Sequence, residues 1–474
     1  MQFLSISLPI LLFLLPIYAE SAIQLEVTSQ AFPVDQSIES TIHSNSDQQH
    51  YLRWEKFIPR PVRGFFNRKA DVKRQEPTRE TDLFLGGHLV GRISLGTPPQ
   101  TLLVAFDTSR SSTWIIASSY KAQNDEKNGI STSKENNDLD IPYNGFNISE
   151  SVTFVNTSQA FLDNSAKGTL GTDFVQLGNS RLPVSQTFGV VTEFTQGAES
   201  LIDGYFGLAL PSTSPLSKTT MLSNILKRVE KPVFTIWIKQ SSSLQHSTRQ
   251  SSGQITFGSA DTSNCANNWQ FVSLIANDNS ASNQPMGAWR FPITGIKIGD
   301  TFTKHMFQVA SLGTDDFFLR VPEPIFAELV QITKATYVDE KINGIPVYSV
   351  NCESVDALPP ITIEIGENDY TVLASTYVIK LQEGKCRLAV SICNHTDPQV
   401  QWIFGATFMR AYCTQFDVEN NRVGFSEPLS TPLDLVDNSN DSAQSSSSWS
   451  MKATKEFRFS ITFCTIFAII LFLR

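Results

Sequence analysis

The sequence predicts an all-β protein, and two observations lead to that class. From about residue 80 the chain consists of short runs of β-branched and aromatic residues that Gly, Pro and Asn interrupt, which is typical of strands joined by turns. Helical patterns are confined to two short segments, 220–229 and 324–333. Many strands with few helices predict sheets that pack on one another around a buried core.

The predicted strands follow one another along the chain, and each is short and bounded by turn residues. Residues from about 23 to 80 differ, because they are polar, locally basic and poor in strand signals. We therefore expect the β body to begin near residue 81. Its clearest strands are expected at 89–95, 101–106, 174–177, 233–238 and 361–365.

Length and charge bound the kind of protein. With 474 residues the chain is long enough for two sizeable cores and further segments. Hydrophobic residues make up 41% and charged residues 18%, as in ordinary globular proteins. The net charge of −9, with no basic block over the main body, argues against a nucleic-acid partner and suits an extracellular surface.

The N-terminus has the pattern of a secretory signal peptide. An apolar run from Leu8 to Ile17 precedes small residues, so we assign residues 1–22 to the signal. The usual positive residues before the run are missing, and an uncleaved anchor is the alternative. The run is short for a bilayer span, which needs about 20 apolar residues. Four sequons indicate the same compartment, and we predict glycosylation at Asn147, Asn156, Asn394 and Asn440.

The C-terminus predicts attachment to a membrane. Residues 431–458 form a Ser/Asn-rich stalk with a polar spacer, and residues 459–473 form an apolar tail. This arrangement matches the signal for a glycosylphosphatidylinositol (GPI) lipid anchor. A transmembrane helix is the alternative, but the tail is short and contains Ser460, Thr462 and Thr465. Either attachment leaves the β body facing outward.

The six cysteines predict disulfides rather than a metal site. No Cys-x-x-Cys pair or histidine cluster accompanies them, and the sequence has no motif for a metal or another cofactor. Thiols of secreted proteins are usually oxidised. Cys464 lies in the apolar tail, so an odd number remains and the pairing is left open among Cys265, Cys352, Cys386, Cys393 and Cys413.

The β body repeats itself loosely. A strand-like run ends at Asp107, and a similar run has Gly313 in the matching place, 206 positions on (313 − 107). Each half later carries an aromatic residue before glycine, in Tyr205–Gly207 and in Ile403–Gly405. The duplication predicts two lobes, each with one loop that contributes to a shared cleft. We place the lobes at 81–255 and 256–430.

Several motifs resemble the pepsin family of aspartic peptidases, in the family's order. The first active-site region is similar to Gly91–Gln100, Val104–Thr108 and Ser112–Ile115. Later segments resemble the flap hairpin, the buried glycine motif and the C-terminal lobe: Phe161–Asp173, Asp203–Leu208, Asn351–Pro359, Trp402–Gly405 and Phe416–Phe425.

The resemblance spans residues 85–428 and implies a bilobal pepsin-like acid protease fold. Two β-barrel-like lobes would then enclose a peptide-binding cleft. The resemblance further implies a propeptide at 23–80 and a disulfide between Cys352 and Cys386.

In the pepsin family two carboxylates catalyse the hydrolysis of a peptide bond. They lie close together and share one proton, so that one activates water while the other protonates the leaving group. Asp107 matches the first carboxylate, and Gly313 stands at the position of the second. Thr108 and Thr314 resemble the family's pair of threonines that hydrogen-bond across the lobes. We therefore expect a retained lobe junction with an incomplete catalytic dyad.

Two acids near Gly313 are the alternative source of a second carboxylate. Asp315 and Asp316 lie two and three positions further on. A carboxylate displaced by that length of backbone is several ångströms out of place, and catalysis tolerates a shift of about 1 Å poorly. We interpret both as solvated loop acids.

Three further positions depart from the family's pattern. Ser109 and Arg110 replace a Gly-Ser pair after the first aspartate. Arg110 either pairs with Asp107 and holds it ionised or points to solvent, and the sequence leaves both open. Phe161 stands where the flap has tyrosine, so the hydroxyl that would bond Trp114 is missing, although the ring could still cover an apolar side chain.

The combined interpretation is a secreted, membrane-anchored, monomeric protein of pepsin type that binds a peptide or protein without cleaving it and uses no cofactor. The alternatives are a weakly active aspartic endopeptidase acting through Asp315 and a generic β-rich adhesin. Asp107 is the lone catalytic-type residue. The resemblance places five further residues at the ligand: Thr108, Ser109, Trp114, Phe161 and Thr314.

Overall fold

β-Strands make up most of the regular structure. A computed structural model of the chain describes residues 22–33, 83–120, 145–163, 166–178, 184–194, 202–211, 220–239, 253–275, 287–342, 345–381, 384–395 and 397–429. The predicted signal peptide, the stalk, the apolar tail, Asn440 and Cys464 lie outside these ranges, except that residue 22 is described.

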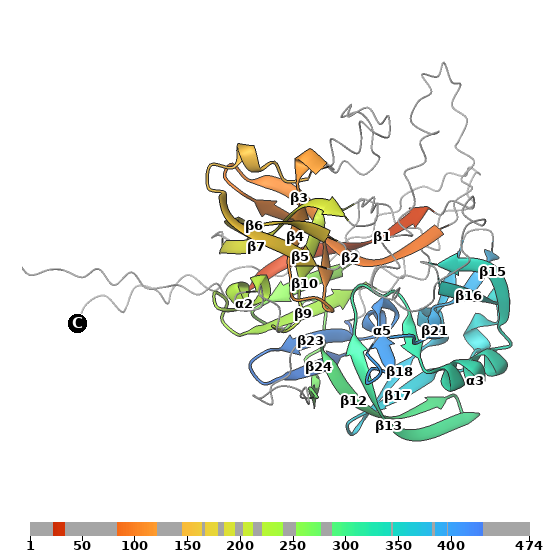
Figure 1. Ribbon diagram of the computed structural model, residues 1–474. Helices are drawn as coiled ribbons and strands as arrows, with labels where there is room; N and C mark the ends of the chain where they lie inside the picture. The colour runs from red at the N-terminus through yellow and green to blue at the C-terminus, as the bar shows by residue number, and fades with distance from the viewer. Residues whose placement is uncertain are drawn as a thin grey trace, which may run out of the picture. The chain divides into compact units, whose positions relative to one another are not determined.

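The largest sheet has thirteen strands among the described residues, in the order β11-β24-β23-β9-β10-β1-β2-β3-β8-β4-β7-β6-β5 (Figure 1). It joins strands from both ends of the β body, because β23 pairs with β9. The strands are β1 Ile23–Pro33, β2 Leu83–Leu95, β3 Gln100–Asp107, β4 Trp114–Ile116, β5 Val155–Asp163, β6 Ala166–Leu177, β7 Val184–Phe194, β8 Gly204–Gly207, β9 Val233–Ile238, β10 Gly253–Phe257, β11 Gln270–Ser273, β23 Cys413–Asp417 and β24 Arg422–Ser426.

Two smaller sheets complete the described β structure. The seven-stranded sheet contains β12 Arg290–Ile298, β13 Phe302–Leu312, β14 Leu319–Val321, β17 Ile361–Ile365, β18 Asn368–Val372, β21 Val390–Ile392 and β22 Trp402–Phe404. The four-stranded sheet contains β15 Thr336–Ile342, β16 Ile345–Val350, β19 Val378–Lys380 and β20 Cys386–Leu388.

Helices are few and short. The two predicted helical segments are present as α2 Met221–Leu226 and α3 Glu323–Thr333. The described residues also contain α4 Ala374–Tyr377, α5 Ala406–Ala411 and the 3-10 turns η3 Ile148–Glu150 and η5 Cys352–Ala357. All five predicted strands are present as well, so the all-β class is confirmed, and the curled sheets agree with a bilobal pepsin-like fold.

β1 is the strand that the sequence analysis missed. It lies between β10 and β2 in the large sheet and pairs with both. Ile23, Leu25 and Val27 are buried while Gln24 and Glu26 are exposed, which is the alternation of a half-buried strand. The expectation of few strands before residue 80 is therefore wrong for 23–33, because the apolar–polar alternation was too short to stand out in a polar segment.

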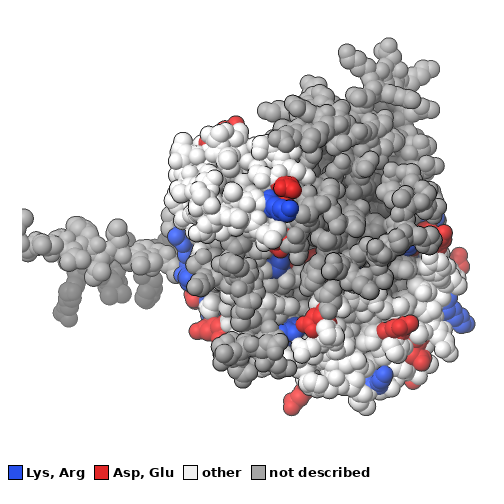
Figure 2. All heavy atoms as spheres, viewed as in Figure 1, with Lys and Arg blue, Asp and Glu red and all other residues white. Residues whose placement is uncertain are grey.

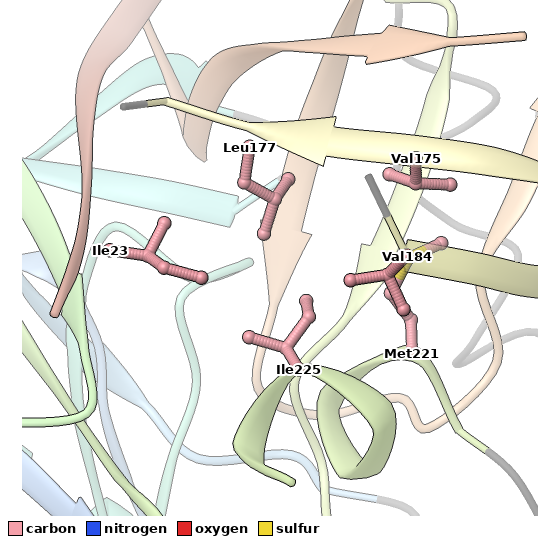
Figure 3. A pocket seen from close by; sticks show the side chains of 6 residues that line it. All are labelled: Ile23, Val175, Leu177, Val184, Met221 and Ile225. Atoms are coloured by element: carbon pink, nitrogen blue, oxygen red, sulfur yellow. The ribbon is translucent and has the colours of Figure 1, made fainter. Parts of the chain in front are cut away.

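The first residue of β1 packs into the core of the sheet. Figure 3 shows its side chain directed into a small apolar cavity with side chains from β6, β7 and α2. Burial of these groups fixes the start of β1 to the body. The cavity is lined by Ile23, Val175, Leu177, Val184, Met221 and Ile225.

The predicted duplication is visible in the strand pairing. β3, which ends at Asp107, runs parallel to β8, and β8 is antiparallel to β4. In the same way β13, which ends just before Gly313, runs parallel to β22, and β22 is antiparallel to β14. The two loops that follow β3 and β13 therefore leave equivalent strands.

Two disulfides cross-link the described residues. The structure contains the Cys352–Cys386 bond that the resemblance implied, and a second bond joins Cys265 to Cys413. Cys393 is a free thiol, and burial raises its pKa to about 11. The odd cysteine of the β body is thus Cys393.

Candidate functional site

The two equivalent loops meet through a reciprocal exchange of hydrogen bonds. The amide of Thr108 donates to Oγ1 of Thr314 (2.9 Å), and the amide of Thr314 donates to Oγ1 of Thr108 (3.1 Å). Each hydroxyl then donates to a carbonyl of the opposite strand, Thr314 to Phe106 (2.7 Å) and Thr108 to Leu312 (3.2 Å). Both threonines are buried, so water does not compete for these bonds.

This exchange makes Asp107 and Gly313 equivalent positions, because each directly precedes its threonine. Two glycines allow the loops to pack closely. A Cβ on Gly207 would lie 2.7 Å from the carbonyl oxygen of Ser112, and a Cβ on Gly405 would lie 2.3 Å from the carbonyl oxygen of Asp316. The repeated aromatic-glycine motifs therefore occur where a side chain would collide with the loop backbone.

Asp107 is buried, and both of its carboxylate oxygens are held. Oδ1 accepts from the amide (2.7 Å) and the hydroxyl (2.5 Å) of Ser109. Oδ2 accepts from Nε of Arg110 (2.7 Å). The alternative that the sequence left open is decided in favour of an ion pair, since Arg110 faces Asp107 rather than solvent. Charge-assisted bonds of this kind suit a carboxylate acceptor.

Arg110 also contacts the predicted flap hairpin, through Asp163. Its Nη1 lies 3.3 Å from Oδ2 of Asp163, which also accepts from the hydroxyl of Ser112 (2.6 Å). The guanidinium carbon lies 4.4 Å from the ring centroid of Tyr205, a cation–π distance. Burial alone lowers the pKa of Arg110, but the carboxylates of Asp107 and Asp163 outweigh it and the net pKa is raised. Arg110 therefore stays charged.

His88 is a site residue that the sequence analysis did not single out. It lies on β2 with its ring edge-on to Tyr205, at 5.9 Å between centroids. Burial lowers its pKa to about 4; Asp107 opposes this shift and Arg110 adds to it. His88 is therefore neutral near neutral pH. No motif in the sequence marks it, because its partners come from distant segments.

Asp315 and Asp316 are not the solvated loop acids that we expected. Both are partly buried. Asp316 accepts from the amide of Phe318 (2.9 Å) and pairs with Nε of Arg320 (2.5 Å). A Cβ on Gly313 would lie 3.1 Å from Oδ1 of Asp315, so the Asp315 side chain turns back toward the space beside the glycine.

The pKa of the Asp315 carboxyl is raised well above its ordinary value. Burial raises its pKa to about 7, and the charges of Asp107 and Asp316 add to that rise, while Arg110 opposes it. The chain makes a turn at Thr314 and Asp315, closed by the amide of Asp316 donating to the carbonyl of Gly313 (3.2 Å). The Asp315 carboxylate therefore lies nearer to Gly313 than its sequence spacing suggested.

Four of the five predicted ligand residues are interior in this structure. Thr108 and Thr314 are buried in the hydrogen-bond exchange, and Trp114 and Phe161 are buried in an apolar cluster with Tyr205. Phe161 packs on Gly189, where a Cβ would lie 2.6 Å from its ring. These four side chains hold the site together, and Ser109 alone of the predicted set is exposed.

The sequons that the structure describes differ in their surroundings. Asn147 is partly buried, and its side chain accepts from Ser149 and donates to Glu150 Oε1 (2.8 Å) at the start of η3. Asn156 and Asn394 are exposed. Glycosylation at all of these positions stays a prediction.

Two kinds of feature are absent from the described residues. Nowhere in the described ranges do three or more His, Cys, Asp or Glu side chains form a group that could hold a metal ion. Within the same ranges no helix has the length and apolar character needed to cross a membrane.

The repeated strands, the exchanged threonines and the buried carboxylate define a duplicated β protein of the aspartic-protease class. The family model for eukaryotic aspartyl protease matches residues 88–428, and the chain belongs to this family. It is 31% identical over 346 residues to Aspartic protease 1 of Caenorhabditis elegans, covering 71% of this chain and 81% of that protein. It is 29% identical over 343 residues to Aspartic protease 17 of the same organism (71% and 82%) and 27% identical over 354 residues to Renin of Ovis aries (72% and 80%).

Proposed function

We propose that this member of the aspartyl protease family binds a peptide or a protein segment at the Asp107/Gly313 site without cleaving it. The observation that carries the proposal is the equivalence of Asp107 and Gly313 on either side of an intact threonine exchange. Peptide hydrolysis by a carboxylate pair needs a base for water and an acid for the leaving group. A glycine supplies neither.

The surroundings of Asp107 support the same conclusion. Ser109 and Arg110 occupy both carboxylate oxygens, so a water bound there competes with three short hydrogen bonds. A thousandfold loss of rate corresponds to about 4 kcal/mol of transition-state stabilisation, and removal of half a dyad is expected to cost at least that. The loops themselves are retained, which favours binding as the remaining role.

The proposal places the protein outside the cell. The apolar N-terminal run, the sequons and the C-terminal tail support a secreted, glycosylated monomer that a lipid anchor holds at the surface, with its peptide ligand as partner. On the face that Figure 2 shows, charges of both signs are dispersed over the described residues without a large basic patch. Together with the net charge of −9, this face gives no support for a nucleic-acid partner.

The test is digestion of a peptide library by the purified full-length chain at pH 4 and pH 7, with peptide capture measured in parallel. We expect capture without cleavage. The matched variant combines Gly313→Asp with Asp315→Gly, Ser109→Gly and Arg110→Ser. Asp315 is replaced as well because its carboxylate lies 3.1 Å from the new Cβ. This variant is expected to gain hydrolysis, whereas cleavage by the wild type that Asp107→Ala abolishes would refute the proposal.

A weakly active endopeptidase is the second candidate, and one observation favours it. Asp315 lies beside Gly313 and burial raises its pKa to about 7, so it holds a proton at acidic pH while Asp107 is paired. An acid and a base would then be present at one site. This candidate predicts slow hydrolysis at pH 4–5 that both Asp315→Asn and Asp107→Ala remove, with Asp316→Asn as the control because Asp316 pairs with Arg320.

A further inference from the structure

The end of β5 is held by two side chains on one face of the strand. Phe161 and Asp163 are two residues apart and therefore point the same way, while Leu162 between them is 69% exposed. Phe161 packs on Gly189 in the apolar cluster, and Asp163 accepts hydrogen bonds from Arg110 and Ser112. The first six residues of β5 are exposed at the edge of the sheet. Backbone pairing holds β6 to β7 and β5 to β6, and these two side chains add an anchor at the end of β5.

The charged anchor leads directly to Asp107. Arg110 uses Nε for Asp107 and Nη1 for Asp163, so one guanidinium joins the loop after β3 to the end of β5. The planar fork of arginine suits two acceptors at fixed positions, whereas the single ammonium of lysine does not. Serine, which the pepsin family has at this position, lacks the length to bridge two carboxylates.

We propose that Arg110 is a positioning residue that holds the β5–β6 hairpin against the Asp107 loop through Asp163 and so slows the release of a bound peptide. The effect on the peptide rests on the proposed function, and the effect on the hairpin does not. An ion pair from Arg110 and a hydroxyl bond from Ser112 thus anchor this hairpin, in which Phe161 has no hydroxyl group.

Hydrogen–deuterium exchange of the full-length chain tests the hairpin. Asp163→Ala removes the bonds to both Arg110 and Ser112. Lys167→Met is the matched control, because Lys167 lies on the same hairpin and its pair with Glu193 is long (3.7 Å) and exposed. We expect amides 155–163 to exchange at least tenfold faster in Asp163→Ala and less than twofold faster in the control, with β12 and β13 unchanged.

A direct variant of the arginine completes the test. Arg110→Met keeps an unbranched side chain, removes the guanidinium that bonds Asp163 and lies over Tyr205, and is expected to show the same faster exchange. It also leaves Asp107 buried without its cation, which endangers folding; for this reason Asp163→Ala is the deciding variant. Equal exchange of β5 in Asp163→Ala and wild type would overturn the proposal.

Peptide release is measured on a peptide captured by the immobilised wild type. We expect dissociation at least threefold faster from Asp163→Ala and unchanged from Lys167→Met. Faster hairpin exchange with an unchanged dissociation rate would overturn the link to ligand release. If the wild type captures no peptide at all, the proposed function fails together with that link. The exchange experiment then still decides the anchoring of the hairpin: Asp163→Ala tests Asp163, and a Ser112→Ala variant that exchanges as fast as Asp163→Ala would assign the anchor to Ser112 instead of Arg110.

Discussion

Replacement of Thr314 by valine tests whether the threonine exchange holds the two loops together. Valine keeps the shape and burial of threonine and removes only the hydroxyl. Two short bonds are lost, from the amide of Thr108 (2.9 Å) and to the carbonyl of Phe106 (2.7 Å), together with a long contact to the Thr108 hydroxyl (3.4 Å). Because the surroundings are buried, the Thr108 amide is left without a partner and water does not replace the hydroxyl.

The expected cost follows from these two bonds. Each intramolecular hydrogen bond contributes about 0.5–1.5 kcal/mol net, and an orphaned buried donor costs about 1–3 kcal/mol. We therefore expect Thr314→Val to lower the free energy of unfolding by about 2–4 kcal/mol. Thr108→Val should cost less, since its hydroxyl makes longer bonds, at 3.1 and 3.2 Å.

Urea-induced unfolding of the full-length chain, followed by tryptophan fluorescence, provides the measurement. Thr314→Ser is the control, because it keeps the hydroxyl and loses one methyl group, for about 1 kcal/mol or less. A difference of under about 0.5 kcal/mol between the valine and serine variants, within ordinary surface-mutation scatter, would refute the reasoning.

Two further predictions concern pH and the cell surface. The pKa of His88 is about 4 in the folded chain against its ordinary 6.5, so the stability it contributes is present above pH 6.5 and lost as pH falls toward 4, by at most about 3 kcal/mol. His88→Gln should therefore flatten the fall in Tm between pH 7 and 4.5, and an unchanged pH profile would contradict this. The lipid-anchor proposal predicts that phosphatidylinositol-specific phospholipase C releases the protein from intact cells, whereas a transmembrane tail would resist it.

Local patterns predicted much of the fold. Runs such as 101–106 and 361–365 contain enough β-branched and apolar residues to specify strands, and the two helical segments occur where they were expected. β1 was missed because it gains its stability from β10 and β2, which lie on both sides of it in the sheet. A strand whose partners lie far along the chain shows little of that support in its own residues.

The candidate site was predicted in outline and corrected in detail. Asp107 and Gly313 were predicted from the internal repeat, and the threonine pair was predicted from the resemblance to the pepsin family. The assignment of Trp114 and Phe161 to the ligand stays a prediction; the structure adds that both side chains are buried in one apolar cluster, Phe161 against Gly189. Asp315 was assigned to solvent, yet it turns back toward Gly313.

By itself the sequence determined the all-β class and the duplicated loops, in which Gly313 stands at the position that matches Asp107, since these depend on residue type and spacing. Only the tertiary structure decided that Arg110 pairs with Asp107 and Asp163, that Cys265 joins Cys413, and that His88 lies beside Tyr205. The physical reason is that these contacts join residues far apart in the sequence. Arg110 and Asp163 are 53 residues apart, and their attraction acts only after the sheet has brought β5 to the loop after β3.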